Sequence, residues 1–239
     1  MLELSDQQLA DFCAAVPWET ATRLPDGRLL GRVASPRALA PAGDYRFQAI
    51  DARRDLGRDR VLEMGCGEGY HTVQLASRFG HVTALEARPR NIACALVNLF
   101  VHGAGNVQLR MMDVREVGPS LGRFDLVFHS GVLYHLSEPV EHLRRIAGLS
   151  DQLLLDTHYA PPGDRYPRAD LDSGGKRYPA VAWREGGWTD VFSGLEAESR
   201  WLRREALLEA LVDVGYRAIE VLAEYEMEVG PRLALWARR

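Results

Sequence analysis

The chain has 239 residues, 46% of them hydrophobic and 26% charged, which is typical of a soluble globular protein with a well-buried core. Its net charge is −4 and its basic residues form no block, so general binding of nucleic acids through phosphates is not indicated. It has no apolar run of membrane-spanning length, and the acidic, amphipathic start MLELSDQQLADF is unlike a signal peptide. We therefore expect a cytoplasmic protein without a membrane partner.

The first part of the chain predicts a helical arm. Residues 1–16 and 45–56 carry apolar residues at helical spacing, whereas 17–43 are punctuated by proline and glycine and indicate an irregular segment. We assign residues 1–57 to an N-terminal helical arm and residues 58–239 to the main domain.

Strands and helices then alternate along the chain. Strands are expected at 60–64, 81–87, 107–113, 124–130 and 152–158, and helices at 70–80, 89–103 and 138–149. This alternation predicts a parallel sheet with helices on both faces, in which ligands bind beyond the carboxyl ends of the strands. A helix at 203–215 and two strands at 216–225 and 232–238 close the chain, the strands as a hairpin at the sheet edge.

Residues 159–200 break the alternation. They show no periodicity, and so long a stretch is typical of a lid or a substrate-binding insertion. Aromatic and basic side chains gather in and just after it: Tyr159, Tyr166, Tyr178, Trp183, Trp188 and Trp201, with Arg165, Arg168, Lys176, Arg177 and Arg184. Such a mixture suits the binding of a sugar or another hydroxylated molecule, and it would equally suit stacked bases. The structural alternative is that the aromatic side chains form the insertion's own small core.

The stretch VLEMGCGEGYHT joins the first predicted strand to a helix through Gly65, Gly67 and Gly69. Glycine permits positive φ and a close approach of a ligand, and the first N–H groups of the helix can donate to an anion. A tight strand-to-helix turn without a ligand is the alternative interpretation.

Two acids strengthen the ligand interpretation. Glu86 ends the second strand, where a carboxylate can accept both hydroxyls of a ribose, and Asp113 ends the third, where it could bind the amino group of an adenine. The three features together describe an adenosine site. The loop reads G-x-G-x-G rather than G-x-G-x-x-G, which makes a dehydrogenase the minor option, and no phosphate loop of the G-x-x-x-x-G-K-[ST] type is present.

The stretches VLEMGCGEGYHT, VTALEARP, MMDV and FDLVFHSGVLYHLSEP, spread over about residues 58–158, resemble the successive motifs of class I S-adenosylmethionine-dependent methyltransferases. The resemblance implies an α/β fold with a Rossmann-like, doubly wound, seven-stranded sheet whose last strand is antiparallel, here with an insertion after the fifth strand. It implies S-adenosyl-L-methionine as the cofactor. The site residues that it implies are Glu63, Gly65, Gly67 and Gly69 around the methionyl moiety, Glu86 at the ribose, Asp113 and Val114 at the adenine, and His129 beside the methionyl group and its methyl.

Methyl transfer to a hydroxyl needs a base or a metal to remove the proton. The candidate bases are His129, His135 and His158, although His129 could serve as a cofactor contact alone and His135 as a structural hydrogen bond. Asp156 and His158 lie two apart in one strand, hence on one face, and could form a metal site, with Mg²⁺ more natural than Zn²⁺, or a base oriented by a carboxylate.

The preferred function is O-methylation of a hydroxyl on a sugar or another polyhydroxylated small molecule. FHSGVLYHLSEPVEHL and PGDRYPRA, within about residues 124–170, are also similar to the family that installs the oxyacetic group on wobble uridine of tRNA with carboxy-S-adenosylmethionine. A nucleoside-binding regulator without catalysis is the third hypothesis.

Overall fold

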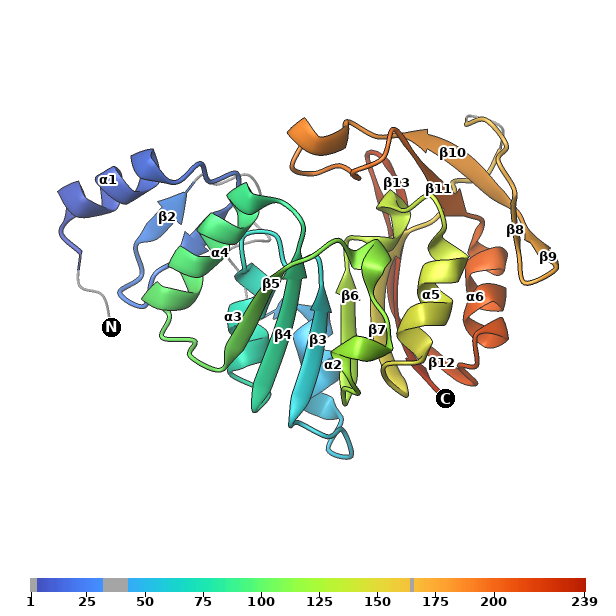
Figure 1. Ribbon diagram of the computed structural model, residues 1–239, viewed down its shortest axis with the longest axis horizontal. Coiled ribbons are helices and arrows are strands. Elements are labelled where there is room, and N and C mark those ends of the chain that lie inside the picture. The colour runs from blue at the N-terminus through green and yellow to red at the C-terminus, as the bar shows by residue number, and fades with distance from the viewer. Residues whose placement is uncertain (1–3, 32–42, 164–165) are drawn as a thin grey trace. The chain divides into compact units, whose positions relative to one another are not determined.

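A computed structural model describes residues 4–31, 43–163 and 166–239. The chain divides into two compact units, Met1–Val114 and Arg115–Arg239 (Figure 1). In the described ranges, no helix is both long and apolar enough to cross a membrane.

The N-terminal arm of the first unit contains helices and a small hairpin. Its elements are α1 (Asp6–Ala15), β1 (Ala21–Arg23), β2 (Leu29–Gly31) and α2 (Tyr45–Ala52). Helix α1 begins with a capping box, in which Ser5 and Gln8 each accept a hydrogen bond from the other's backbone N–H. The hairpin stands where we expected only irregular chain. Pro25 and Asp26 form the turn, which the N–H of Gly27 closes by donating to the carbonyl oxygen of Leu24 at 2.9 Å, and Gly27 has φ +91°. The rest of that segment, residues 32–42, lies outside the described residues.

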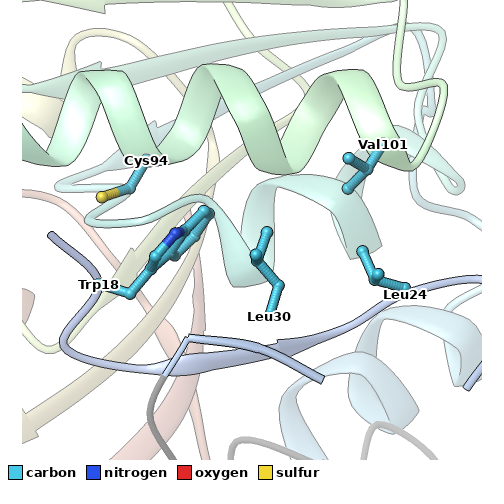
Figure 2. Packing of buried hydrophobic residues seen from close by; sticks show 5 residues of the cluster. All are labelled: Trp18, Leu24, Leu30, Cys94 and Val101. Atoms are coloured by element: carbon cyan, nitrogen blue, oxygen red, sulfur yellow. The ribbon is translucent and has the colours of Figure 1, made fainter. Parts of the chain in front are cut away.

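The arm packs against α4 (Pro89–Val101) through buried apolar side chains (Figure 2). Trp18, Leu24 and Leu30 contact Cys94 and Val101, and all of these are less than a tenth exposed. The packing removes these large apolar side chains from water, and this hydrophobic effect is the main force that holds the arm in place.

The sheet strands of the first unit are parallel. They and the helix between them are β3 (Arg60–Met64), α3 (Tyr70–Ala76), β4 (His81–Glu86) and β5 (Val107–Met111). Val61 pairs with Val82, and Val82 with Val107. Strands β3 and β4 are buried at every position after their first residues, because both of their faces are covered. Helix α3 ends at Ala76 rather than at Gly80, and α2 ends at Ala52 rather than at residue 56. The bounds of β3, β4, β5 and α4 agree with the predicted ones within two residues.

The second unit contains the remaining strands of the large sheet. Its elements outside the insertion are η3 (Val114–Glu116) at the unit boundary, η4 (Pro119–Leu121), β6 (Leu126–Ser130), η5 (Leu133–His135), α5 (Pro139–Ala147), β7 (Gln152–His158), α6 (Arg204–Asp213), β12 (Ala218–Met227) and β13 (Gly230–Arg238). Strands β6 and β7 are parallel, whereas β13 is antiparallel to both β7 and β12. The predicted terminal hairpin is therefore present, and β13 places it beside β7.

The insertion at 159–200 has its own short strands. They are β8 (Leu171–Ser173), β9 (Lys176–Tyr178), β10 (Ala180–Arg184) and β11 (Glu198–Leu202), with the 3-10 turn η6 (Gly187–Thr189) between the last two. β8 pairs with β9 and β10 with β11, each antiparallel, and the β8–β9 hairpin lies beside α6 (Figure 1). Arg165, one of the predicted cations, lies outside the described residues.

The seven strands of the large sheet follow the order β12-β13-β7-β6-β3-β4-β5. This order, with parallel strands and one antiparallel strand, β13, the last in the chain, confirms the predicted Rossmann-like α/β fold. The carboxyl ends of the parallel strands are the positions where ligands bind in such sheets.

Candidate active site

The glycine loop between β3 and α3 has the backbone that its sequence predicted. Gly65, Gly67 and Gly69 have φ angles of +67°, +54° and +84°, which side chains with a Cβ rarely adopt. A Cβ at Gly67 would meet no atom within 4 Å, so open space lies beside the loop. A Cβ at Gly69 would instead come within 3.2 Å of Ala95, so this glycine lets α3 pack closely on α4.

Glu86, the last residue of β4, ties the glycine loop to its neighbour. Its Oε2 accepts a hydrogen bond from the N–H of Gly67 at 2.9 Å, and its Oε1 accepts one from the N–H of Arg88 at 2.8 Å. The carboxylate is 6% exposed. Because a carboxylate has about four lone-pair positions, it retains acceptor capacity for the two hydroxyls of a ribose.

Glu63 lies near the end of β3 and is almost sealed from solvent, at 1% exposure. The hydroxyl of Thr72 donates a hydrogen bond to its Oε2 at 2.6 Å. Burial raises the pKa of Glu63 to about 7, and the negative charge of nearby Glu86 adds to this rise. The hydrogen bond from Thr72 lowers the pKa but does not outweigh burial. This carboxyl group changes charge close to neutral pH.

Asp113 and Val114 follow β5 and are both partly exposed. The glycine loop, Glu86 and Asp113 therefore follow or end three successive strands of the first unit, as the sequence predicted. Their contacts with the methionyl, ribose and adenine groups stay predictions.

His129 lies in β6 with no exposed surface, and its Nε2 is 2.9 Å from Nε2 of His142 on α5. Burial, together with the nearby His142, holds the pKa of His129 well below its usual range, so the ring is neutral. Its other nitrogen, Nδ1, has no hydrogen-bond partner in the described part of the chain. This environment favours a structural role that joins α5 to the sheet, and the contact with the methionyl group stays a prediction.

Asp156 and His158 share β7 but have different partners. Asp156, which is 0% exposed, forms an ion pair with Arg232, whose Nε lies 2.5 Å from Oδ1. His158 donates from Nδ1 to the carbonyl oxygen of Pro231 at 3.1 Å if its proton is on that nitrogen. Burial and the charge of Arg232 lower the pKa of His158 to about 4.

These partners leave little support for the predicted metal site. Among the described residues, no three His, Cys, Asp or Glu side chains are grouped so that they could hold a metal ion. The negative charge of Asp156 is balanced by Arg232. The Mg²⁺ site at Asp156 and His158 stays a prediction, and the geometry does not favour it. The alternative of a base oriented by a carboxylate is not favoured either, because the described hydrogen bonds join Asp156 to Arg232 and His158 to Pro231, and none of them joins Asp156 to His158.

His135, by contrast, contacts a carboxylate that the sequence analysis missed. Its Nδ1 is 3.1 and 3.0 Å from the two oxygens of Glu185, and its ring lies against Tyr134 with centroids 4.1 Å apart. Glu185 follows β10 in the stretch WREGGW, where one acid beside two glycines gives no recognisable motif. A carboxylate–histidine pair of this kind can remove a proton from a hydroxyl group.

Aromatic rings form a continuous cluster next to this pair. Tyr134 packs edge-on against His158 at 4.7 Å, His158 stacks on Trp201 at 5.1 Å, and Trp201 stacks on Trp183 at 4.3 Å. Tyr166 continues the series at 5.0 Å from Trp183. We call these five residues the aromatic cluster.

The other aromatic residues singled out in the insertion lie elsewhere. Tyr159 donates to Glu224 at 2.8 Å, and Tyr178 donates to Asp213 at 2.8 Å. Trp188 is 56% exposed. Tyr159 and Tyr178 thus join the insertion to β12 and α6. Trp201 packs with Val181, and Tyr166 and Trp183 pack against them, which is the small core of the insertion that the structural alternative predicted.

Comparisons with known proteins agree with the fold. A family model described as a methyltransferase domain matches residues 61–150. The N-terminal domain of EvdMO1, crystallised in the presence of SAH and D-fucose, is 30% identical with a TM-score of 0.80, over 98% of this chain and 97% of that one. The match to a crystal structure of EvdMO1 itself has 26% identity and a TM-score of 0.69 and covers 49% of that chain. The DhpI–SAH complex, 21% identical with a TM-score of 0.53 over 82% of this chain and 83% of that one, shares the fold.

Curated relatives are tRNA U34 carboxymethyltransferases. That of Aeromonas hydrophila is 36% identical over 103 residues, 41% of this chain and 31% of the relative. That of Enterobacter sp. is 31% identical over 188 residues, 65% of this chain and 58% of the relative. The chain thus spans less than two thirds of the length of these relatives. From the sheet, the glycine loop and these similarities it follows that the chain belongs to the S-adenosylmethionine-dependent methyltransferases, with S-adenosylmethionine as its cofactor.

Proposed function

We propose that the chain methylates a hydroxyl group of a sugar or of a similar polyhydroxylated small molecule. The observation that carries this proposal is the similarity, over 98% of the chain, to a domain crystallised in the presence of SAH and D-fucose. The net charge of −4 agrees with an uncharged acceptor better than with a polyanion.

The residues of the first unit fit the cofactor. The open space beside Gly67 leaves room for a close backbone approach, and Glu86 has acceptor capacity left for a ribose. When bound, S-adenosylmethionine supplies a methyl group on a positively charged sulfur. Glu63, Asp113 and Val114 complete the set of residues that we expect to hold it.

We expect the acceptor to bind beside the aromatic cluster of the second unit, in which Trp201 is 2% exposed and packs with Ala160 and Val181. The indole Nε1 of Trp201 is buried without a hydrogen-bond partner in the described residues, so its N–H can donate to an acceptor oxygen. A pKa of about 4 keeps His158 neutral at neutral pH, with one ring nitrogen able to accept from a hydroxyl. Apolar ring faces with a few polar atoms are the usual lining of sites for small hydroxylated molecules.

His135 is our candidate for the base. Bound S-adenosylmethionine would give up its methyl group to the acceptor oxygen and would leave as S-adenosylhomocysteine, and the nitrogen of His135 that does not contact Glu185 would take the hydroxyl proton. Histidine suits this task because its unperturbed pKa, about 6.5, lies near neutral pH.

Transfer of a carboxymethyl group to tRNA is the second candidate. It is favoured by the curated relatives, which are 30% to 36% identical over the matched regions. Stacked bases would also suit the aromatic cluster.

One assay separates the two candidates. The protein is incubated with S-adenosylmethionine and D-fucose or related hexoses, and in parallel with carboxy-S-adenosylmethionine and tRNA that lacks the U34 modification. A gain of one methyl group on a sugar, detected by mass spectrometry and lost in His135→Gln, is the expected result. Modified tRNA with untouched sugars would replace the proposal by the second candidate.

A further inference from the structure

We propose that Glu185 is a positioning residue for this methyl transfer: it holds His135 in the tautomer with its proton on Nδ1, so that Nε2 is the nitrogen that takes the acceptor proton. The inference rests on the proposed function for its catalytic consequence. The tautomer itself is independent of any acceptor.

The carboxylate of Glu185 is surrounded by donors, with 1% of its side chain exposed. Oε2 accepts from the hydroxyl of Ser193 at 2.5 Å and from the N–H of Gly194 at 2.6 Å, and Oε1 accepts from the hydroxyl of Ser199 at 2.6 Å. Both oxygens also contact Nδ1 of His135. A buried carboxylate with this many donors is held in one orientation.

The direction of these hydrogen bonds is determined by their neighbours. The N–H of Gly194 can only donate. The hydroxyl oxygen of Ser193 accepts from the N–H of Gly186 at 2.6 Å, which leaves its own proton for Glu185. Oε2 of Glu185 is therefore an acceptor from both groups, as an ionised carboxylate is.

The ionised carboxylate requires a proton on Nδ1 of His135. Burial alone would raise the pKa of Glu185, but the hydrogen bonds from His135, Ser193 and Ser199 act against burial and lower that pKa. A lone pair on Nδ1 would face the carboxylate oxygens and repel them. In a neutral ring the proton therefore sits on Nδ1, and Nε2 carries the lone pair.

The surroundings of His135 leave Nε2 available. Among the described residues, Nε2 has no hydrogen-bond partner, and the side chain is 17% exposed. The Tyr134 ring limits rotation of the imidazole. Gly194 lies directly against the backbone of η5, since a Cβ there would be 2.5 Å from the carbonyl oxygen of His135. The loop that carries Glu185 is thus packed against the histidine that it orients.

Exchange of the carboxylate for an amide should select the wrong tautomer. In Glu185→Gln the amide N–H₂ can donate to Nδ1, which then favours the proton on Nε2 and removes the base. In a Ser-His-Asp triad, the corresponding exchange of Asp for Asn selects the wrong tautomer and lowers kcat about 10⁴-fold. We expect kcat to fall at least 100-fold, with KM and the Kd for S-adenosylhomocysteine changed less than about threefold.

The test combines NMR with kinetics. Protein labelled with ¹⁵N at histidine gives the tautomer of His135 from two-bond ¹H–¹⁵N spectra, and the signal is assigned with His135→Gln. The expected result is an Nδ1–H tautomer in the wild type and an Nε2–H tautomer in Glu185→Gln. Glu196→Gln is the matched control, because Glu196 binds Ser137 and Arg115 but not the ring, and its tautomer and kcat should match the wild type.

Two results would overturn the inference: an Nε2–H tautomer in the wild type, or a kcat in Glu185→Gln within threefold of the wild type. If Glu185→Gln does not fold, the wild-type spectrum still decides the tautomer without any variant. If no sugar is methylated, the proposed function fails, while the same spectrum tests the inferred orientation of His135.

Discussion

The hydroxyl of Thr72 and the carboxyl of Glu63 form a hydrogen bond of 2.6 Å, and both side chains are at most 1% exposed. Thr72 comes from the first turns of α3 and Glu63 from β3, so the bond joins the two elements that flank the glycine loop. A carboxyl group with a pKa of about 7 in this position couples the charge of the loop region to pH.

Glu63→Gln should stabilise the protein above pH 7. Because the folded-state pKa of Glu63 is raised from 4.5 to about 7, the stability it contributes is fully present below pH 4.5 and is lost as the pH rises through 7. The variant lacks this loss, so its free energy of unfolding should exceed that of the wild type by up to about 3 kcal/mol at pH 8 and should match it near pH 4.5. Urea unfolding at both pH values measures this, and equal differences at both would contradict it.

Gly67→Ala and Gly69→Ala should have different effects. Both glycines have positive φ, so each substitution costs about 1 kcal/mol of strain. Gly67→Ala adds a methyl group to open space and should mainly weaken cofactor binding, whereas Gly69→Ala also pushes on Ala95 and should mainly lower stability. Calorimetric titration with S-adenosylhomocysteine and thermal unfolding separate the two. A Gly67→Ala variant with wild-type affinity would argue against a close approach of the ligand at this residue.

Glu86→Ala should weaken S-adenosylmethionine binding by about 2–3 kcal/mol, because the charge-assisted hydrogen bonds that we predict between Glu86 and the ribose would be lost. It also removes the acceptor for the N–H groups of Gly67 and Arg88, so some loss of stability should accompany it. Glu86→Gln keeps the shape and serves as the comparison. Unchanged affinity in calorimetry would show that the ribose binds elsewhere.

Asp156→Asn should destabilise the protein by about 3–5 kcal/mol, since it leaves the Arg232 guanidinium, with 14% of its side chain exposed, without a counter-charge. Removing both charges in Asp156→Asn with Arg232→Met should recover much of that loss. Denaturant unfolding of the two single variants and the double variant gives the coupling energy. Strictly additive effects would mean that the pair does not interact.

Mg²⁺ at millimolar concentration should change neither the methylation rate nor the affinity for S-adenosylmethionine by more than about twofold. The reason is that Arg232 already balances the charge of Asp156, which lowers its affinity for a cation. Assays with added Mg²⁺ and with a chelator measure this directly. A rate that needs Mg²⁺ and is lost in His158→Ala would restore the predicted metal site.

Local sequence patterns predicted most of the fold. Strands β3 and β7 match their predicted bounds residue for residue, because an apolar run between turn residues is a signal confined to a few positions. The turn at Pro25, Asp26 and Gly27 has an equally local signal, although it lies in a segment that we predicted to be irregular.

By itself, then, the sequence determined the sheet, the glycine loop and the acids at the strand ends, since each follows from periodicity or from a glycine where φ must be positive. The tertiary structure decided the partners: Glu185 for His135 across 50 positions, His142 for His129, and Arg232 for Asp156 across 76. Such pairs depend on which side chains the packed chain brings within about 3 Å of one another and on how far it excludes water from them. No local sequence pattern encodes these distances or this exclusion of water. Both of them set the charge and the tautomer of a histidine.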